Sequence, residues 1–277
     1  MAEIAVDAPG RERHGTPQNY RFKNSNHLMQ LSGKVALVTG GTRGIGAAAA
    51  LALAREAADL AIVGRHEDDD ARTTLRAIRA LGQRGELILA DCSEPADCTR
   101  AVEETAQRLG GVDVLIHSAG GPVNGGLLEL TPEAWHGAFA VHVHAIFYLC
   151  RAAIPLMRPK QEGAVILISS TAGKLATPSH LAYQAVKGAI PHLTRGLARE
   201  FAADNIRFNC VAPGVIRTKF HEKMSPEQKK LNLEQRIPLR REGTPEQVAD
   251  AILQLVKNDY ITGDTVTIDG GLTMRIA

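Results

Sequence analysis

Short apolar runs alternate with longer helical patterns from about residue 33 to the end of the chain. The run 35–38 is rich in β-branched residues, and the alanine-rich stretch 46–58 that follows it favours a helix. The same alternation recurs along the chain, which indicates parallel strands that are buried on both faces and joined by helices. Further strands are predicted at 60–63, 87–90, 112–117, 164–169, 206–211 and 266–268.

Three of the predicted helices share one start signature. Thr131, Ser225 and Thr244 each precede a proline and then a glutamate. A hydroxyl at the N-cap, a proline at the first helical position and an acid near the positive end of the helix dipole all favour initiation. Helices are predicted at 46–58, 69–81, 94–109, 132–157 and 181–203, and two more begin at Pro226 and Pro245.

Seven strands in this order predict one α/β domain over residues 31–277, with a doubly wound, seven-stranded parallel sheet and helices on both faces. No linker or internal repeat divides this range. Residues 1–30 are polar, lack hydrophobic periodicity and contain two glycines and two prolines. They are therefore predicted to form an N-terminal tail outside the core.

Composition and charge exclude several classes of function. The 277 residues are 44% hydrophobic and carry a net charge of +2, without a basic block that would favour nucleic acid or an anionic membrane. The apolar runs are shorter than the ~20 residues of a membrane span, and residues 1–30 lack the apolar core of a secretion signal. Four cysteines without CxxC spacing indicate reduced thiols, and no metal site is expected. The expectation is a soluble, cytoplasmic protein.

A glycine-rich turn lies between the first predicted strand and the first predicted helix. It reads Thr39-Gly40-Gly41-Thr42-Arg43-Gly44-Ile45-Gly46. Glycines permit a tight turn, and the free N–H groups and positive dipole end of the next helix favour a pyrophosphate. Glycines also serve turns that bind nothing, but this place between strand and helix is the one that dinucleotide binding requires.

Tyr183 and Lys187 are four residues apart in a predicted helix, so their side chains share one helix face. A neighbouring cation lowers the pKa of a tyrosine from about 10 toward neutrality, which suits a group that donates and accepts protons. An isolated pair of this kind is more often a half-buried tyrosine beside a solvated lysine. Ser170 ends an apolar strand thirteen residues earlier, where ligands bind in open α/β sheets, although such a serine alone often serves a turn.

Taken together, these motifs resemble those of the short-chain dehydrogenase/reductase family, and the likeness covers about residues 31–277. The resemblance implies a single Rossmann-type fold with a nicotinamide cofactor. It rests on Thr39–Gly46, on Ser170 with Tyr183 and Lys187, on Ala212-Pro213-Gly214 and on Asp269-Gly270-Gly271.

The resemblance implies a role for each residue of the site. Tyr183 is the expected general acid/base, Ser170 holds the substrate oxygen, and Lys187 binds the nicotinamide ribose and lowers the tyrosine pKa. The expected reaction is hydride transfer between the cofactor and a carbonyl or secondary alcohol. The expected cofactor contacts are Gly40, Thr42, Arg43, Gly44, Ile45, Gly46, Arg65, Asp91, Ser118, Ala119, Gly120, Tyr183, Lys187, Pro213, Gly214, Ile216 and Thr218.

Two positions depart from the family pattern. The usual Asn-Asn-Ala-Gly after the fourth strand reads His117-Ser118-Ala119-Gly120, and the catalytic asparagine of the next helix matches His142. In the family, that asparagine holds a water that connects the lysine to solvent. A neutral imidazole also donates and accepts hydrogen bonds, so His142 is a candidate catalytic residue. Since histidine titrates near 6.5, reduction is expected to fall below roughly pH 6, unless His142 turns away from the site.

The end of the second strand predicts which cofactor binds. An NAD-specific site places an acid there to bind both ribose hydroxyls. Here Gly64 takes its place, Arg65 follows, and Arg43 lies in the glycine-rich turn. An arginine binds a 2′-phosphate through paired hydrogen bonds, so the pattern predicts NADP(H) rather than NAD(H), unless both arginines are ordinary surface charges. Asp91 matches the family's acid beside the adenine, but a residue that begins a helix would look the same.

The first hypothesis is an NADP(H)-dependent carbonyl reductase that acts on a small-molecule ketone or alcohol. The alternative is a cofactor-binding regulatory or scaffold protein with little turnover; the change at His142 favours it, whereas Tyr183 and Lys187 favour an enzyme. The loop 215–240 is largely polar and does not specify the substrate. The resemblance also implies a homotetramer that is formed through the helices 132–157 and 181–203.

Overall fold

A computed structural model describes residues 28–219 and 224–274 of the chain. Seven parallel strands form one sheet in the order β3-β2-β1-β4-β5-β6-β7, which confirms the doubly wound α/β fold. The chain crosses from one half of the sheet to the other between β3 and β4. The strands are β1 (Val35–Thr39), β2 (Asp59–Gly64), β3 (Gly85–Leu89), β4 (Val114–His117), β5 (Gly163–Ile168), β6 (Ile206–Pro213) and β7 (Thr265–Ile268).

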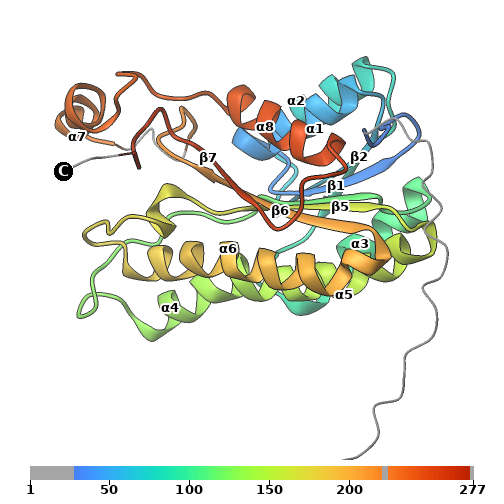
Figure 1. The fold of residues 1–277 in the computed structure, drawn as a ribbon, viewed down its shortest axis with the longest axis horizontal. Helices are drawn as coiled ribbons and strands as arrows, with labels where there is room; N and C mark the ends of the chain where they lie inside the picture. Colours follow the sequence, from blue (N-terminus) through green and yellow to red (C-terminus); the bar gives the residue numbers. More distant parts are fainter. Residues whose placement is uncertain (1–27, 220–223, 275–277) are drawn as a thin grey trace, which may run out of the picture.

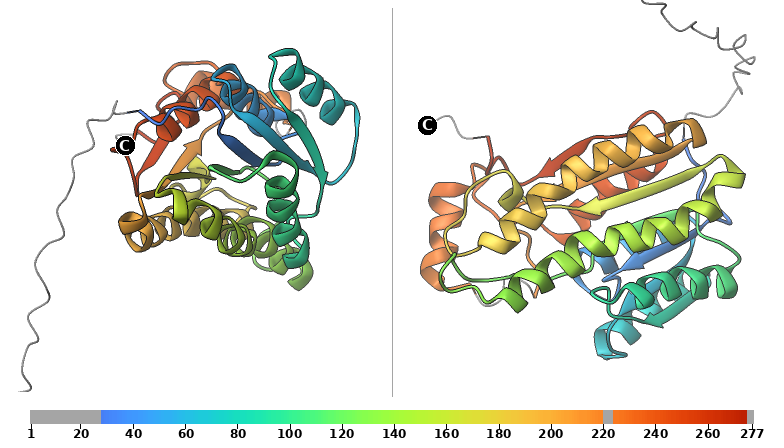
Figure 2. Two further views of the ribbon diagram at one scale, coloured as in Figure 1. Left: turned by 90° about the vertical axis from the view of Figure 1, so that its right-hand side faces the viewer. Right: turned by 90° about the horizontal axis from the view of Figure 1, so that it is seen from below.

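Two layers of helices enclose the sheet (Figures 1 and 2). Alternate residues of β1 serve the two layers, because Val35 and Leu37 pack in one core cluster and Ala36 and Val38 in the other. This two-sided burial explains why the central strands β1, β4 and β5 are apolar along most of their length. One layer contains α1 (Gly44–Arg55), α2 (Asp69–Ala80) and α8 (Pro245–Lys257), and the other contains α3 (Pro95–Leu109), α5 (Ala145–Met157) and α6 (Leu181–Phe201).

The predicted helix 132–157 is not one continuous α-helix. A π-helical turn, Ala140–His144, joins α4 (Pro132–Phe139) to α5. The backbone N–H of Ala145 donates to the carbonyl of Ala140, five residues earlier, instead of to Val141. Such turns occur often at functional sites, and this one contains His142.

The sequence shows only apolar runs that are shorter than a membrane span. The helical segment around the π turn is longer and more apolar than those runs suggested. Residues 132–160 form 29 consecutive helical residues, and their most apolar window has a mean hydropathy of 1.5. Within the described part of the chain, this is the one helix whose length and composition would allow it to cross a membrane. Ile146, Leu149 and Met157 of this segment are buried in the core beneath the sheet.

The core begins earlier than the predicted boundary at residue 30. Met29 is 4% exposed and belongs to the core cluster that includes α1 and α8. Its backbone N–H donates to the carbonyl of Lys257 at 2.7 Å, and Leu28 forms a β-bridge with Asn258. The predicted tail therefore ends before Leu28, and its residues 1–27 lie outside the described part.

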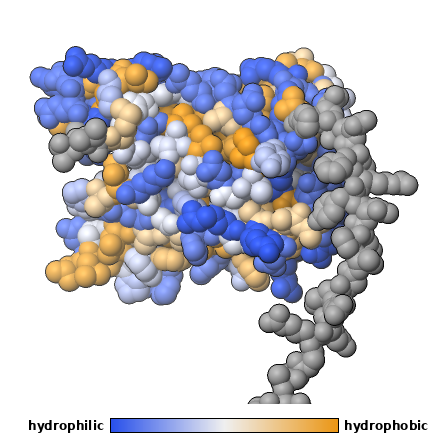
Figure 3. Space-filling model, in the orientation of Figure 1, coloured by the Kyte–Doolittle hydropathy of each residue, from blue (hydrophilic) through white to orange (hydrophobic). Residues whose placement is uncertain are grey.

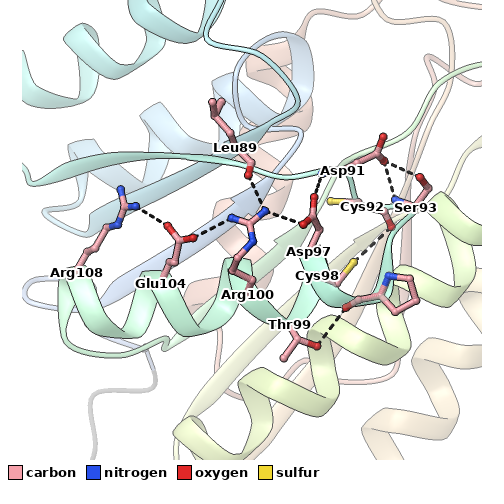
Figure 4. A network of polar contacts seen from close by, with 11 residues as sticks. Leu89, Asp91, Cys92, Ser93, Asp97, Cys98, Thr99, Arg100, Glu104 and Arg108 are labelled. Atoms are coloured by element: carbon pink, nitrogen blue, oxygen red, sulfur yellow. Dashed lines mark hydrogen bonds and ion pairs between the residues drawn. The ribbon is translucent and has the colours of Figure 1, made fainter.

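A charged network borders the edge strand β3 (Figure 4). Arg100 of α3 donates to the carbonyl of Leu89 at 3.0 Å and pairs with Asp97 at 2.7 Å and Glu104 at 2.8 Å. Arg108 also pairs with Glu104. Exposed ion pairs of this kind contribute little stability one by one, but here they hold Arg100 against the end of the strand.

Arg207 of β6 joins the sheet to the end of α8. Its buried guanidinium donates to the carbonyls of Leu255, Val256 and Ile261. The last carbonyls of a helix have no partner within the helix, and a cation is favourable there. Burial lowers the pKa of Arg207 below its ordinary value.

We expect Arg207→Met to lower the free energy of unfolding by about 3 kcal/mol, because it removes charge-assisted hydrogen bonds and leaves buried carbonyls unsatisfied. Urea unfolding measures this loss. Arg199→Met, which removes an exposed arginine of α6, is the matched control. Equal losses in the two variants would show that the carbonyl contacts of Arg207 contribute nothing.

Candidate active site

Ser170 and Tyr183 meet at the carboxyl end of the sheet. Ser170 follows β5, and the short 3-10 turn Thr171–Gly173 packs against α6, which carries Tyr183. A Cβ on Gly173 would lie 2.6 Å from the carbonyl carbon of Lys187, so only glycine allows this approach. The Ser170 hydroxyl accepts the N–H of Ala172 at 3.1 Å and hydrogen-bonds to the phenol of Tyr183.

Lys187 lies buried beside Tyr183, on the same face of α6. Its Nζ donates to the carbonyl of Ile168 at 2.8 Å and lies 5.6 Å from the centre of the Tyr183 ring. The hydroxyl of Ser169 donates to the backbone carbonyl of Lys187 at 2.6 Å, which ties α6 to the end of β5. Burial lowers the pKa of Lys187 to about 8, because the ammonium loses its hydration.

The pKa of Tyr183 moves opposite to the direction expected from a neighbouring lysine. Burial raises the pKa of Tyr183 above its ordinary value, and the hydrogen bond from Ser170 lowers it by a smaller amount. At neutral pH the phenol therefore keeps its proton.

His142 turns into the site and packs on Gly120. A Cβ on Gly120 would lie 2.0 Å from Cε1 of the imidazole, and the ring stands edge-on to Tyr183 at 5.9 Å between centres. Its Nε2 lies 3.1 Å from the carbonyl of Gly121; since a carbonyl only accepts, Nε2 carries the proton. Nδ1 is buried and has no hydrogen-bond partner among the described residues. Because Nε2 carries the proton, Nδ1 can only accept a hydrogen bond.

The expectation that His142 titrates near pH 6.5 is wrong, so its protonation cannot cause a fall in activity below pH 6. Burial first, and then the charge of Lys187, lower the pKa of His142 to about 2. The imidazole therefore stays neutral at any pH at which the protein would be assayed. It keeps one donor and one acceptor throughout.

The sequence motifs mark His117 only as a departure from the usual Asn-Asn-Ala-Gly and assign it no role in the site. It is 3% exposed at the end of β4, with Nδ1 2.8 Å from the hydroxyl of Thr39 and Nε2 3.0 Å from the carbonyl of Val141. Nε2 must donate to that carbonyl, so Nδ1 accepts from Thr39. Burial first, and then Lys187, lower the pKa of His117 to about 4. A histidine that ends an otherwise apolar strand was the available signal.

The glycine-rich turn has the form that a pyrophosphate requires. Gly40 and Gly44 have φ angles of +63° and +57°, and a Cβ on Gly46 would lie 2.1 Å from the carbonyl oxygen of Gly40. No side chain caps α1, and no acid lies in its first turn, whereas the N-cap side chains of α2, α4, α7 (Pro226–Leu231) and α8 cap those helices. The helices α3 and α6 also lack a side-chain cap, but neither follows a glycine-rich turn. The uncapped start of α1 therefore suits an anionic group.

Other predicted cofactor residues converge on this turn. A Cβ on Gly40 would lie 2.8 Å from the backbone N of Ala119, and one on Gly44 would lie 3.5 Å from the methyl group of Thr218. The N–H of Ala119 donates to the Thr39 hydroxyl at 3.3 Å. The turn, the loop after β4 and the segment after β6 thus meet at one edge of the sheet. Predicted residues within these segments include Thr42, Ile45, Ser118, Pro213, Gly214 and Ile216.

The arginines predicted to bind a 2′-phosphate lie at the same edge, but acids face them. Arg43 lies 3.5 Å from the carboxylates of both Asp68 and Asp70, and Arg65 lies 4.0 Å from Asp91. The side chains of both arginines are more than half exposed, so these pairs are weak. A bound phosphate would compete with these carboxylates for the same guanidinium groups.

Asp91 does not begin α3, whose N-cap is Glu94, but it has a local role in the turn before that helix. One of its oxygens accepts both the N–H and the hydroxyl of Ser93, and these bonds lower the pKa of Asp91. The carboxylate thus shapes the turn before α3 while it faces Arg65.

Comparisons with known proteins agree with this geometry. A family model described as Enoyl-(Acyl carrier protein) reductase matches residues 40–273. Glucose 1-dehydrogenase of Gluconobacter oxydans is 36% identical over 88% of this chain and 94% of that protein. A short-chain type dehydrogenase/reductase from Mycobacterium marinum has a TM-score of 0.84 and 31% identity, over 89% of this chain and 98% of that one. A blue fluorescent protein from a metagenomic library, solved in complex with NADPH, has a TM-score of 0.82 and 34% identity, over 88% and 99%.

We expect the burial of Lys187 to make stability rise between about pH 8 and pH 10.5. Its pKa is about 8 in the folded protein against an ordinary 10.5, so the unfolded chain binds more protons in this window. The free energy of unfolding of the native chain minus that of Lys187→Met should rise by roughly 3 kcal/mol between pH 8 and pH 10.5. Below pH 8 this difference should change little with pH. Unfolding curves at several pH values measure this, with the exposed Lys229→Met as control. A constant difference up to pH 10.5 would contradict the burial of this charge.

Proposed function

Because this chain belongs to the short-chain dehydrogenase/reductase family, an oxidoreductase family that binds nicotinamide cofactors, we propose that it interconverts a ketone and a secondary alcohol with NADP(H). The convergence of Ser170, Tyr183 and Lys187 at the carboxyl edge of the sheet supports this most strongly. The uncapped start of α1 lies at the same edge and fits the pyrophosphate of the cofactor.

Ser170 and Tyr183 bind the oxygen of the substrate through their hydroxyls and stabilise the negative charge that develops on it during reduction. A bound nicotinamide supplies the hydride, or accepts it in the reverse direction. Tyr183 is the general acid, and its raised pKa keeps the phenol protonated and ready to donate at neutral pH. Oxidation of an alcohol needs the phenolate instead and therefore proceeds best at higher pH.

Lys187 and His142 return the proton to Tyr183. With a pKa of about 8, Lys187 is protonated at neutral pH and still gives up its proton readily. The unpartnered Nδ1 of His142 accepts a hydrogen bond from a water that links the lysine to solvent. Because His142 stays neutral, this route remains intact as the pH falls toward about 5.

Steric and electrostatic features support the preference for NADP(H). A Cβ on Gly64 would lie 2.6 Å from the methyl group of Thr42, so the acid of an NAD-specific site would require Thr42 to move. Arg43 and Arg65 are held at the same edge by acids that a 2′-phosphate can replace. One structural neighbour was solved in complex with NADPH.

A cofactor-binding protein with little turnover is the second candidate function. The raised pKa of Tyr183 favours it, because the phenol is rarely ionised at neutral pH and the phenolate that alcohol oxidation needs is scarce. A panel of acceptors separates the two functions. It includes a sugar and an acyl thioester, as the relatives suggest. It also includes apolar ketones, because Leu127 and Leu128 in the loop before α4 are 77% and 97% exposed. Figure 3 shows an apolar patch at the lower left, on the side of the molecule where α4 lies.

We expect Tyr183→Phe to lower kcat at least about 100-fold, while the fold and the Kd for NADPH are unchanged, because only the proton donor is lost. Steady-state kinetics and fluorescence titration with NADPH measure the two quantities. Retention of more than about a tenth of the native kcat would overturn the assignment of Tyr183. No turnover by the native chain with any acceptor, despite NADPH binding, would favour the second candidate function.

We expect the native chain to prefer NADPH to NADH, and the double variant Arg43→Ala/Arg65→Ala to raise KM for NADPH by at least about 100-fold. Each charge-assisted hydrogen bond to the phosphate contributes roughly 1.5–3 kcal/mol. KM for NADH should change little, and the exposed Arg199→Ala is the control. Equal kcat/KM for the two cofactors in the native chain would contradict the proposed preference.

A further inference from the structure

Two buried histidines connect the end of β4 and the loop after it to the π turn, and each donates a hydrogen bond to a carbonyl of the other segment. His117, on the strand, donates from Nε2 to the carbonyl of Val141 in the turn at 3.0 Å. His142, in the turn, donates from Nε2 to the carbonyl of Gly121 in the loop after the strand at 3.1 Å. Each segment therefore holds the other through one imidazole.

We propose that His117 is a positioning residue for the reaction, which fixes the π turn so that the imidazole of His142 stays edge-on to Tyr183 with Nδ1 as a buried acceptor. This inference rests on the proposed function, since the water route through His142 is part of it. The two described hydrogen bonds of His117 go to Thr39 and Val141, not to Ser170 or Tyr183. His117 acts through the backbone of Val141, one residue before His142.

The π turn provides the carbonyl that His117 binds. In an α-helix, the N–H of Ala145 would donate to Val141, but here it donates to Ala140. The carbonyl of Val141 thus loses its usual helical donor, and the imidazole of His117 takes that place. A buried carbonyl without a donor is costly, so His117 and the π turn stabilise each other.

The orientation of the His117 ring is set from its other side. The hydroxyl of Thr39 donates to Nδ1 at 2.8 Å and also accepts the N–H of Ala119. Thr39 is the last residue of β1 and immediately precedes Gly40 of the glycine-rich turn. His117 therefore links the glycine-rich turn to the π turn that carries His142. Its pKa of about 4 keeps this pattern of donor and acceptor at neutral pH.

Two amide substitutions separate the two nitrogens of His117. The amide of glutamine reaches about as far as Nε2, so His117→Gln keeps a donor for Val141. The amide of asparagine reaches only as far as Nδ1, so His117→Asn keeps the contact with Thr39 and loses the one with Val141. Thr105→Val is the matched control, because it removes another buried hydrogen bond, on α3, to the carbonyl of Ala101.

We expect His117→Asn to lower kcat between about tenfold and 100-fold, since a small misplacement of a catalytic group has effects of that size. KM for NADPH should stay within about twofold of the native value, and backbone amides of residues 140–146 should exchange with deuterium faster. His117→Gln should retain more than about a third of the native kcat and the native exchange rates. Thr105→Val should leave kcat unchanged.

Two results would overturn the inference. One is a native kcat in His117→Asn, and the other is an equal loss of kcat in His117→Gln, which would show that the contact with Val141 is irrelevant. Deuterium exchange needs no substrate, so it decides the question even if the native chain turns over no acceptor. In that case, unchanged deuterium exchange at residues 140–146 in His117→Asn refutes the positioning role. Faster exchange supports the positioning role, and only the proposed reaction fails.

Discussion

The burial of the sheet on both faces is the constraint on which the rest of the molecule depends. Because helices cover both faces, the central strands β1, β4 and β5 are apolar along most of their length, and their polar side chains lie where the strands end. Thr39 and His117 are the last residues of β1 and β4, and Ser169 and Ser170 follow β5 directly. The candidate site is therefore the carboxyl edge of the sheet, and its hydrogen bonds run between neighbouring strand ends.

Burial and one neighbouring cation together keep two imidazoles of the site neutral. Lys187 keeps a single described hydrogen bond from Nζ, to the carbonyl of Ile168, and its charge adds to burial in lowering the pKa of both His117 and His142. Neutral imidazoles present one donor and one acceptor each, which is the pattern that amide side chains also offer. This electrostatic setting makes two histidines compatible with positions where the family has asparagines.

Most of the fold and the principal site residues could be predicted, because apolar periodicity and motif spacing are local properties of the chain. The strand ends, the glycine-rich turn and the meeting of Ser170 with Tyr183 follow from them. The π turn could not be predicted, since 140–144 continues a helical pattern and differs only in its hydrogen bonds. The acids that face Arg43, the upward pKa shift of Tyr183 and the burial of Met29 depend on tertiary neighbours, which no local pattern encodes.

The charged network beside β3 has a consequence for the behaviour of the chain at high concentration. An edge strand in an open sheet offers unpaired backbone groups to which a strand of another molecule can add, and this is a common start of aggregation. Arg100 occupies the carbonyl of Leu89, and Asp97, Glu104 and Arg108 place charges of both signs along the same border. A second molecule would have to desolvate these charges in order to extend the sheet. The network therefore disfavours the addition of a further strand at the β3 edge of the sheet.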